Sequence, residues 1–385
     1  MGNLLEEFTA ELNGYFFLSE YSFDKNQFRA SSNQELELAD HVIALPDALF
    51  IFQMKERDSG ATSDEASVDE WFRHKVLKKG CGQIADSLSF LKDQPSLWVK
   101  NLRGHQHDLA SLNKPVIPIL LYASGPIVPD NVAVKRHQLS KRAGFVHVLR
   151  ISDYYHLCHT LALPSELIAY FAFRLDLLLR NPGLQWEEAR ITAQFISKAH
   201  EPVTDIEARE LLDDARYDVS SFDLTPILRR FGEKVTYLDG RGGDLDYYRI
   251  LGEFSKPSRA EMRGVKRLLT WALDNAGGDE MRMPARMRSL NTGTGFVVIP
   301  IHGGAFNTRL NALNNYSVAA KYESRLERQI GISVARDGTE VELDWLYIEH
   351  PWQHDAEVER MLSTHYPFRP EPTPQIEYRY PRYAR

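Results

Sequence analysis

Hydrophobic residues near the start of the chain recur every three or four positions. Between residues 3 and 17 they form one stripe, made of Leu4, Leu5, Phe8, Leu12, Tyr15 and Phe16. This spacing is typical of an amphipathic helix that packs one face against a core. Asn3 precedes the stripe and Glu6 follows three residues later, which is a helix N-cap pattern. The sequence therefore predicts a helix over residues 3–17, followed by a strand within residues 20–30.

Residues 37–56 contain two apolar runs with a turn between them. The first run is ELADHVIAL and the second is ALFIFQMKE, and both are rich in aliphatic or aromatic residues. Pro46 and Asp47 separate the runs and are common turn residues. The pattern predicts a β-hairpin. A polar stretch follows, and the spacing then predicts a long helix from about residue 68 to residue 92.

Two further apolar runs are nearly uninterrupted: KPVIPILLY at 114–122 and GFVHVLRI at 144–151. Such runs are typical of strands that are buried on both faces of a sheet. A polar loop joins them. Residues 153–180 are predicted to form two helices separated at Pro164 and Ser165, with Ser165 as the N-cap of the second. The first half of the chain is therefore predicted to run helix, strand, two-stranded hairpin, helix, strand, strand, helix.

The chain of 385 residues is longer than one ordinary core, so we expect two domains. The first is predicted to span residues 1–184 and to end at the Asn-Pro-Gly sequence of residues 181–183. The second, residues 185–365, is expected to be helical at first and then α+β, with a hairpin about Asp337-Gly338. Residues 366–385 are rich in Pro and Tyr and are predicted to form an extended tail.

Composition agrees with a globular protein that stays out of the membrane. Hydrophobic residues make up 43% of the chain, but no apolar run is long enough to span a bilayer. The N-terminus carries Glu where a signal peptide would carry Lys or Arg. Two widely separated cysteines, Cys81 and Cys158, exclude a disulfide framework. We therefore expect a cytoplasmic protein with no membrane partner.

The net charge of −7 counts against a protein that coats duplex nucleic acid, since such proteins are usually basic. Local basic clusters nevertheless occur. The clusters are Lys75, Lys78 and Lys79, then Lys135, Arg136, Lys141 and Arg142, then Arg282, Arg286 and Arg288. Each cluster taken alone is also what a solvated charged face would look like.

The predicted hairpin brings three polar residues together. Gln53 and Lys55 are two residues apart, so their side chains share one face of the strand. Asp40 lies on the partner strand, and twelve residues separate it from Gln53. The Asp40 carboxylate, the Gln53 amide oxygen and the Met54 carbonyl are oxygen donors of the kind that Mg²⁺ prefers. Lys55 would then orient a water or offset the charge that develops on a phosphate.

Asp40 followed by Gln53-Met54-Lys55 resembles the motif of the PD-(D/E)xK nuclease superfamily, in which an Asp on one strand precedes (D/E)-x-K on the next. Gln53 stands where the usual acid would be, as it does in the Q-x-K branches of the family. The resemblance covers residues 1–180 and implies a restriction-endonuclease-like αβββαβ core with a central mixed sheet. It also implies an endonuclease that uses Mg²⁺ or Mn²⁺ to hydrolyse DNA, as bacterial restriction and antiphage defence effectors do.

The same resemblance suggests roles for residues outside the hairpin. Glu6 closes a G-x-x-x-E pattern in the first helix and would be an outer residue of the catalytic site. Lys78, Lys79 and Gln83 lie in the helix that follows Lys55 and would contact nucleic acid. In the loop 131–142 we expect the four cationic residues to bind backbone phosphates; they are Lys135, Arg136, Lys141 and Arg142.

Two other interpretations of the hairpin are open. Asp40 and Lys55 can form an ordinary cross-strand ion pair on an exposed sheet face. Alternatively, Gln53 marks a lost metal site, and the chain is a catalytically inactive module that binds nucleic acid or a partner protein. The residues do not separate DNA from RNA, and they are compatible with a homo-oligomer or with a partner protein from a defence system.

Overall fold

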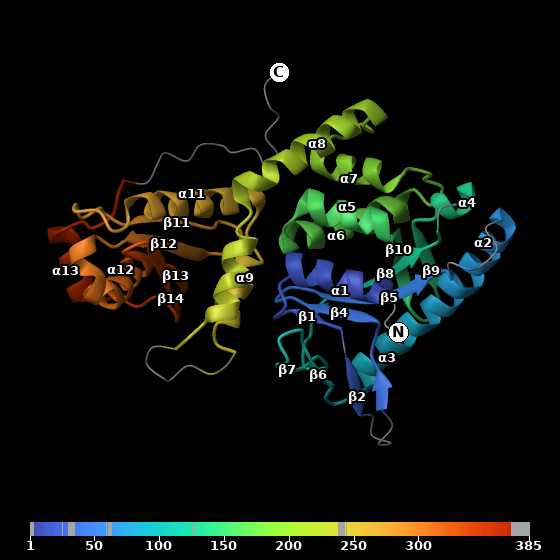
Figure 1. Cartoon of the computed structure of the whole chain (residues 1–385), viewed down its shortest axis with the longest axis horizontal. Helices are drawn as coiled ribbons and strands as arrows, with labels where there is room; N and C mark the ends of the chain where they lie inside the picture. The colour runs from blue at the N-terminus through green and yellow to red at the C-terminus, as the bar shows by residue number, and fades with distance from the viewer. Residues whose placement is uncertain are drawn as a thin grey trace. The chain divides into compact units, whose positions relative to one another are not determined.

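The computed structural model describes residues 4–24, 26–29, 35–58, 60, 64–125, 128–237, 243 and 245–370. The chain divides into two compact units (Figure 1). The first unit comprises Met1–Val219 with Arg229–Glu233, and the second comprises Ser220–Leu228 with Lys234–Arg385. The expected mixed α/β architecture with a central mixed sheet is confirmed in the first unit.

Among the described residues, a sheet of six strands forms the centre of the first unit. Its order is β1 (Ser22–Phe23), β4 (His41–Ala44), β5 (Leu49–Glu56), β8 (Val116–Ala123), β10 (Gly144–Arg150) and β9 (His137–Ser140). Strand β5 is antiparallel to β4 and parallel to β8, and β8 is parallel to β10. The predicted hairpin is therefore confirmed as β4 and β5, and the two apolar runs are β8 and β10.

Helices cover both faces of this sheet. One face packs against α1 (Leu4–Phe16), α5 (Ile151–Leu161) and α6 (Pro164–Arg180). Aromatic rings make these contacts: the ring of Phe50 on β5 lies 5.8 Å from the ring of Phe171 on α6. The other face packs against one continuous helical stretch, α2 (Glu65–Trp71), η1 (Phe72–Gly80) and α3 (Cys81–Asp93). Phe72 contacts Tyr122 of β8 there, with ring centroids 4.9 Å apart.

The middle of that long helix is a π-helix rather than the α-helix that the sequence predicts. The stretch begins at Asp64, whose side chain accepts a hydrogen bond from the N–H of Ser67 at 2.9 Å. It lies close to β8 because Gly80 has no side chain. A Cβ at Gly80 would lie 2.5 Å from Cδ2 of the buried Leu120.

Short elements complete the first unit. The small hairpins are β2 (Gln27–Arg29) with β3 (Glu35–Glu37) and β6 (Trp98–Lys100) with β7 (Gln106–Asp108). The segment expected to be a loop at 131–142 contains α4 (Asp130–Ala133) and strand β9. It is ordered because β9 pairs antiparallel with β10 and closes the edge of the sheet.

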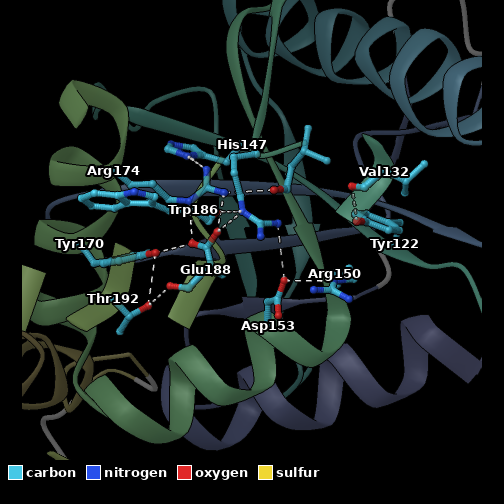
Figure 2. A network of polar contacts seen from close by, with 12 residues as sticks. Tyr122, Val132, His147, Arg150, Asp153, Tyr170, Arg174, Trp186, Glu188 and Thr192 are labelled. Carbon is cyan, nitrogen blue, oxygen red and sulfur yellow. Dashed lines mark hydrogen bonds and ion pairs between the residues drawn. The ribbon is translucent and has the colours of Figure 1, made fainter. Parts of the chain in front are cut away.

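A buried ion pair extends the first unit past the boundary predicted at residue 184. Helix α7 (Glu188–Ser197) follows that boundary, and both oxygens of the Glu188 carboxylate accept hydrogen bonds from Arg174 on α6, at 2.7 and 2.9 Å (Figure 2). Burial alone would raise the pKa of Glu188, but Arg174, together with Arg136 and the Tyr170 hydroxyl, holds that pKa below its usual value. Arg174 also contacts His147 Nδ1 at 2.9 Å. Helices α6 and α7 are thus fastened to β10 by one polar network.

The second unit contains a four-stranded sheet in the order β11 (Ala285–Arg288), β12 (Thr294–Pro300), β13 (Arg328–Asp337) and β14 (Glu340–Glu349), among the residues described there. Strands β13 and β14 form the hairpin predicted about Asp337-Gly338, and Gly338 has a φ of 60°. The helices of this unit are α10 (Tyr248–Phe254), α11 (Arg259–Asn275), η2 (Gly303–Thr308), α12 (Arg309–Ser324) and α13 (Ala356–Thr364). Helices α8 (Asp205–Phe222) and α9 (Thr225–Lys234) belong in part to each unit.

The predicted extended tail begins with a packed segment. Phe368 is completely buried, and its ring lies 6.4 Å from that of Tyr316 on α12. Residues 371–385 lie outside the described part of the chain. Within the described residues, no helix combines the length and the apolar composition that a bilayer crossing requires.

The buried pair predicts a large asymmetry between two arginines of α6. Arg174→Met should lower the free energy of unfolding by about 3–5 kcal/mol, because it leaves the Glu188 carboxylate buried without its guanidinium partner. Arg180→Met should change the free energy of unfolding by no more than about 1 kcal/mol, since Arg180 and its partner Asp176 are 75% and 55% exposed. Urea unfolding measures both. Equal effects of the two substitutions would show that the Arg174 pair does not fasten α6 to α7.

Candidate active site

Asp40 lies immediately before β4 and contacts the neighbouring strand β5. Its Oδ2 atom accepts a hydrogen bond from the backbone N–H of Met54 at 2.5 Å. The ammonium of Lys55 lies 3.5 Å from the same oxygen and donates to the Met54 carbonyl at 2.7 Å. The strand pairing therefore brings together Asp40, Met54 and Lys55, three of the residues that the sequence selects.

The side-chain amide of Gln53 also faces Asp40. One of its terminal atoms lies 3.2 Å from each oxygen of the Asp40 carboxylate, and hydrogen bonding to a carboxylate identifies that atom as the nitrogen. The register explains this placement, because His41 is paired with Phe52 and the next residues outward, Asp40 and Gln53, share the opposite face. The site is mostly covered: Gln53 is 3% exposed, and the side chains of Asp40 and Lys55 are 13% and 15% exposed. The ion pair between Asp40 and Lys55 is therefore formed, but on a mostly covered face of the sheet rather than on an exposed one.

Glu37 lies within electrostatic reach of Asp40, and Glu6 lies within electrostatic reach of Glu37. Burial raises the pKa of Glu37, and the negative charges of Asp40 and Glu6 raise it further, while Lys55 opposes them. The first turn of α1 lies beside the end of β5, since the N–H of Leu5 donates to Glu56 at 3.4 Å. Glu6 is thus near the site, as the resemblance implies. The sequence analysis did not predict Glu37 as a site residue. The one feature that could have indicated it is its position three residues before Asp40.

The donor set suits a hard cation in its chemistry but is arranged around a lysine. Asp40, the Met54 carbonyl and the Gln53 amide oxygen are ligands that Mg²⁺ or Mn²⁺ accepts. The Lys55 ammonium lies between the first two, and the Gln53 amide presents its nitrogen to Asp40. Among the described residues, no three His, Cys, Asp or Glu side chains are grouped so as to hold a metal. Binding of a divalent ion therefore requires Lys55 to move aside and the amide to turn.

The basic residues predicted to bind nucleic acid lie in two different environments: some line or adjoin a groove, and Arg136 is buried. Lys78 and Arg142 line one groove of about 480 Å³ between η1–α3 and β9. Lys135 is close enough to Cys81, another lining residue, for its charge to lower the pKa of that thiol, although burial raises the same pKa more strongly, to about 11. Lys79 and Lys141 are exposed nearby in sequence.

Arg136 is not with this group. Its side chain is 2% exposed, and its Nε donates to the Trp186 carbonyl at 2.9 Å. It forms ion pairs with Asp153 at 3.9 Å and with Glu188 at 3.8 Å. A side chain held inside the protein in this way has a structural role, and it cannot reach a phosphate without unpacking.

Gln83 lies on the side of α3 that faces the candidate active site. Ser87, one turn later, donates its hydroxyl to the Leu38 carbonyl, two residues before Asp40. The Gln83 side-chain oxygen is buried and has no hydrogen-bond partner among the described residues. Its placement fits an inner residue of the site better than a surface contact to nucleic acid.

His41 is buried on the opposite face of the same hairpin. It is fully covered, its ring lies 5.9 Å from that of Phe52, and neither ring nitrogen has a hydrogen-bond partner among the described residues. Burial lowers the pKa of His41 to about 3, so the imidazole is neutral in the folded protein. Protonation of His41 in acid would therefore place a buried charge on β4, next to Asp40, and destabilise the fold.

Comparisons of the chain with protein-family models, with curated proteins and with solved structures gave no match.

Gln53→Glu tests whether the pocket holds a divalent ion. Without metal the new buried carboxylate would face Asp40 at close range, so the midpoint of thermal unfolding should fall. With Mn²⁺ at one hundred times its dissociation constant, binding should restore about 2.7 kcal/mol. Gln106→Glu, on an exposed residue of β7, is the control. If Mn²⁺ raises the midpoint of Gln53→Glu no more than that of the control, the metal assignment is wrong.

The buried His41 predicts a defined loss of stability in acid. Below a pH of about 6.5 the unfolded chain protonates His41, whereas the folded protein does not until a pH of about 3. Stability therefore falls as the pH drops through this window, by up to about 1.4 kcal/mol per pH unit for this one residue. His41→Leu should be flatter than the wild type between these limits and parallel to it above pH 7. Parallel curves throughout the window would contradict the burial of a neutral imidazole.

Proposed function

We propose that the first unit is a divalent-metal-dependent nuclease that hydrolyses phosphodiester bonds of DNA. The observation that carries the proposal is the convergence of Gln53 and Lys55 on the Asp40 carboxylate, with polar atoms within 3.5 Å. Burying an isolated carboxylate is unfavourable, so a carboxylate held here beside two weakly exposed polar groups points to a binding role. A hard cation and a phosphodiester are the ligands that this combination of an acid, an amide and a lysine suits best.

The order of elements supports a restriction-endonuclease-like core. Helix α1, strands β1, β4 and β5, the helical crossover α2–η1–α3 and strand β8 occur along the chain in the order α-β-β-β-α-β, with the hairpin β2–β3 inserted after β1 and the hairpin β6–β7 inserted before β8. The sheet is mixed, Asp40 lies immediately before the second of those strands, and the Gln53-Met54-Lys55 sequence lies on the third. A bacterial restriction or antiphage defence role is the biological setting that such a nuclease would serve.

Each residue would have a distinct task. Asp40, the Met54 carbonyl and the Gln53 amide oxygen would hold the ion, with Glu6 and Glu37 reinforcing the negative potential around it. When bound, Mg²⁺ or Mn²⁺ supplies a Lewis acid that polarises a phosphate oxygen and makes an attacking water more acidic. Lys55, released from Asp40, would offset the negative charge that develops on the phosphate.

A catalytically inactive binding module is the second candidate, and one observation favours it. The Lys55 ammonium already lies between Asp40 and the Met54 carbonyl, so the site is neutralised by the chain itself. Such a module would keep its stability in the presence of chelators and gain none from Mn²⁺. A metal-dependent gain in the wild type favours the nuclease instead.

Lys55→Ala is the direct test of the proposed reaction. The variant should cleave plasmid DNA at least about a hundredfold more slowly than the wild type with Mg²⁺ or Mn²⁺, because that is the usual contribution of one charge-stabilising group. Lys92→Ala, an exposed residue of α3, should cleave normally. Matching RNA substrates determine which nucleic acid is cut. Cleavage by Lys55→Ala at the wild-type rate would remove the assignment.

A further inference from the structure

We propose that the groove between the π-helix and strand β9 binds the phosphodiester backbone of a nucleic-acid strand, at a place separate from Asp40. The proposal rests on the proposed function only in naming nucleic acid as the ligand. The groove has a volume of about 480 Å³, and the residues that line it include Arg73, Leu77, Lys78, Cys81, Leu139 and Arg142. Its volume is within the range of about 300–1,000 Å³ that is usual for ligand sites.

The lining has a single sign of charge. Three cationic side chains contribute to it, Arg73, Lys78 and Arg142, and no carboxylate does. Lys78 has no ion-pair partner among the described residues, and Lys135 adds its charge from beside Cys81. In a protein with a net charge of −7, such local concentration is what gives a polyanion a place to bind.

The π-helix is the reason that these cations share one side. In an α-helix, residues three and four apart are neighbours, whereas residues five apart point away from each other. Hydrogen bonds in a π-helix join residues five apart, so Arg73 and Lys78 lie on the same side of η1. Together with Leu77 they form one wall of the groove. π-Helical turns are rare and are frequent at functional sites, which agrees with a ligand-binding wall.

The two arginines are held by ion pairs that a phosphate can replace. Arg142 contacts Asp86 at 2.7 Å, and their side chains are 67% and 53% exposed. Arg73 contacts Asp69 at 2.6 Å and is 66% exposed. Ion pairs this exposed contribute little, whereas a phosphate can accept two parallel hydrogen bonds from a guanidinium. Asp86 therefore competes with the ligand for Arg142. Leu77 and Leu139, which also line the groove, offer apolar surface to sugars and bases.

This competition predicts opposite effects from the two members of one ion pair. In EDTA, fluorescence anisotropy of the full chain with labelled single-stranded and duplex DNA and RNA should show weaker binding for Arg142→Ala and Lys78→Ala. The log–log salt slope should fall by about 0.7 per lost contact on a single strand, or about 0.9 on a duplex. Asp86→Asn should instead tighten binding, by up to about fivefold.

The chain offers a matched control on α6. Arg180 and Asp176 form an equally exposed pair at 2.8 Å, so Arg180→Ala and Asp176→Asn change the net charge by the same amounts. These variants should bind as the wild type does. Polyglutamate at equal charge should compete poorly, because it lacks tetrahedral phosphates. Because all the substituted side chains are well exposed, the thermal midpoint serves as the check that each variant is folded.

Three results would overturn the groove: an unchanged salt slope in Arg142→Ala, no tightening in Asp86→Asn, or equal effects from the α6 controls. Effective competition by polyglutamate would also overturn it, by showing a general anion surface. The binding measurements test the groove independently of whether the protein cleaves nucleic acid. If Lys55→Ala abolishes cleavage while the groove variants bind normally, the groove fails and the nuclease stands; the reverse pattern leaves the groove and removes the nuclease.

Discussion

The parallel pairing of β5 with β8 is the constraint on which the rest of the first unit depends. Parallel neighbours need a long crossover connection, and here the connection is the helical stretch α2–η1–α3. That crossover covers one face of the sheet while α1, α5 and α6 cover the other, so β5 is buried on both sides. Its polar residues are therefore confined to the end where the strand leaves the core. The candidate active site and the basic groove both follow from this crossover, since Gln83 faces the first and Lys78 lines the second.

Charge balance around Asp40 decides between the two candidate functions. The carboxylate is almost covered, and the backbone of Met54, the Lys55 ammonium and the Gln53 amide all donate to it or lie beside it. Gln53 is neutral, whereas an Asp or Glu at this position would carry a second negative charge. The single positive charge of Lys55 can therefore balance the single negative charge of Asp40. Burial raises the pKa of Glu37, and the negative charges of Asp40 and Glu6 raise it further. A divalent ion would have to compete with Lys55 for the same oxygens, and metal affinity measures the outcome of that competition.

The basic side chains illustrate how position in the fold changes the role of one residue type. Arg136 and Arg142 belong to the same cluster in the sequence, yet one is enclosed beside Asp153 and Glu188 while the other lies exposed on the groove. Arg136 immediately precedes β9, and its side chain forms ion pairs with Asp153 on α5 and with Glu188 on α7. Arg142 lies beyond β9, in the turn that leads to β10. The edge strand thus separates a structural arginine from one that is open to a ligand.

The sequence by itself determined the local elements and the composition of the candidate site. The alternation of side chains along a strand has a period of two, so the hairpin alone fixed that Gln53 and Lys55 share a face and that Asp40 can meet them. Likewise, the uninterrupted apolar runs fixed β8 and β10 as buried strands. Only the tertiary structure decided what depends on contacts between distant segments. These contacts bury Arg136, fasten α7 to the first unit through Arg174, and set a π-helical wall opposite β9. Local periodicity predicts which face of an element a side chain lies on. The residue that it contacts across the core depends on how distant segments pack together, and no single segment contains that information.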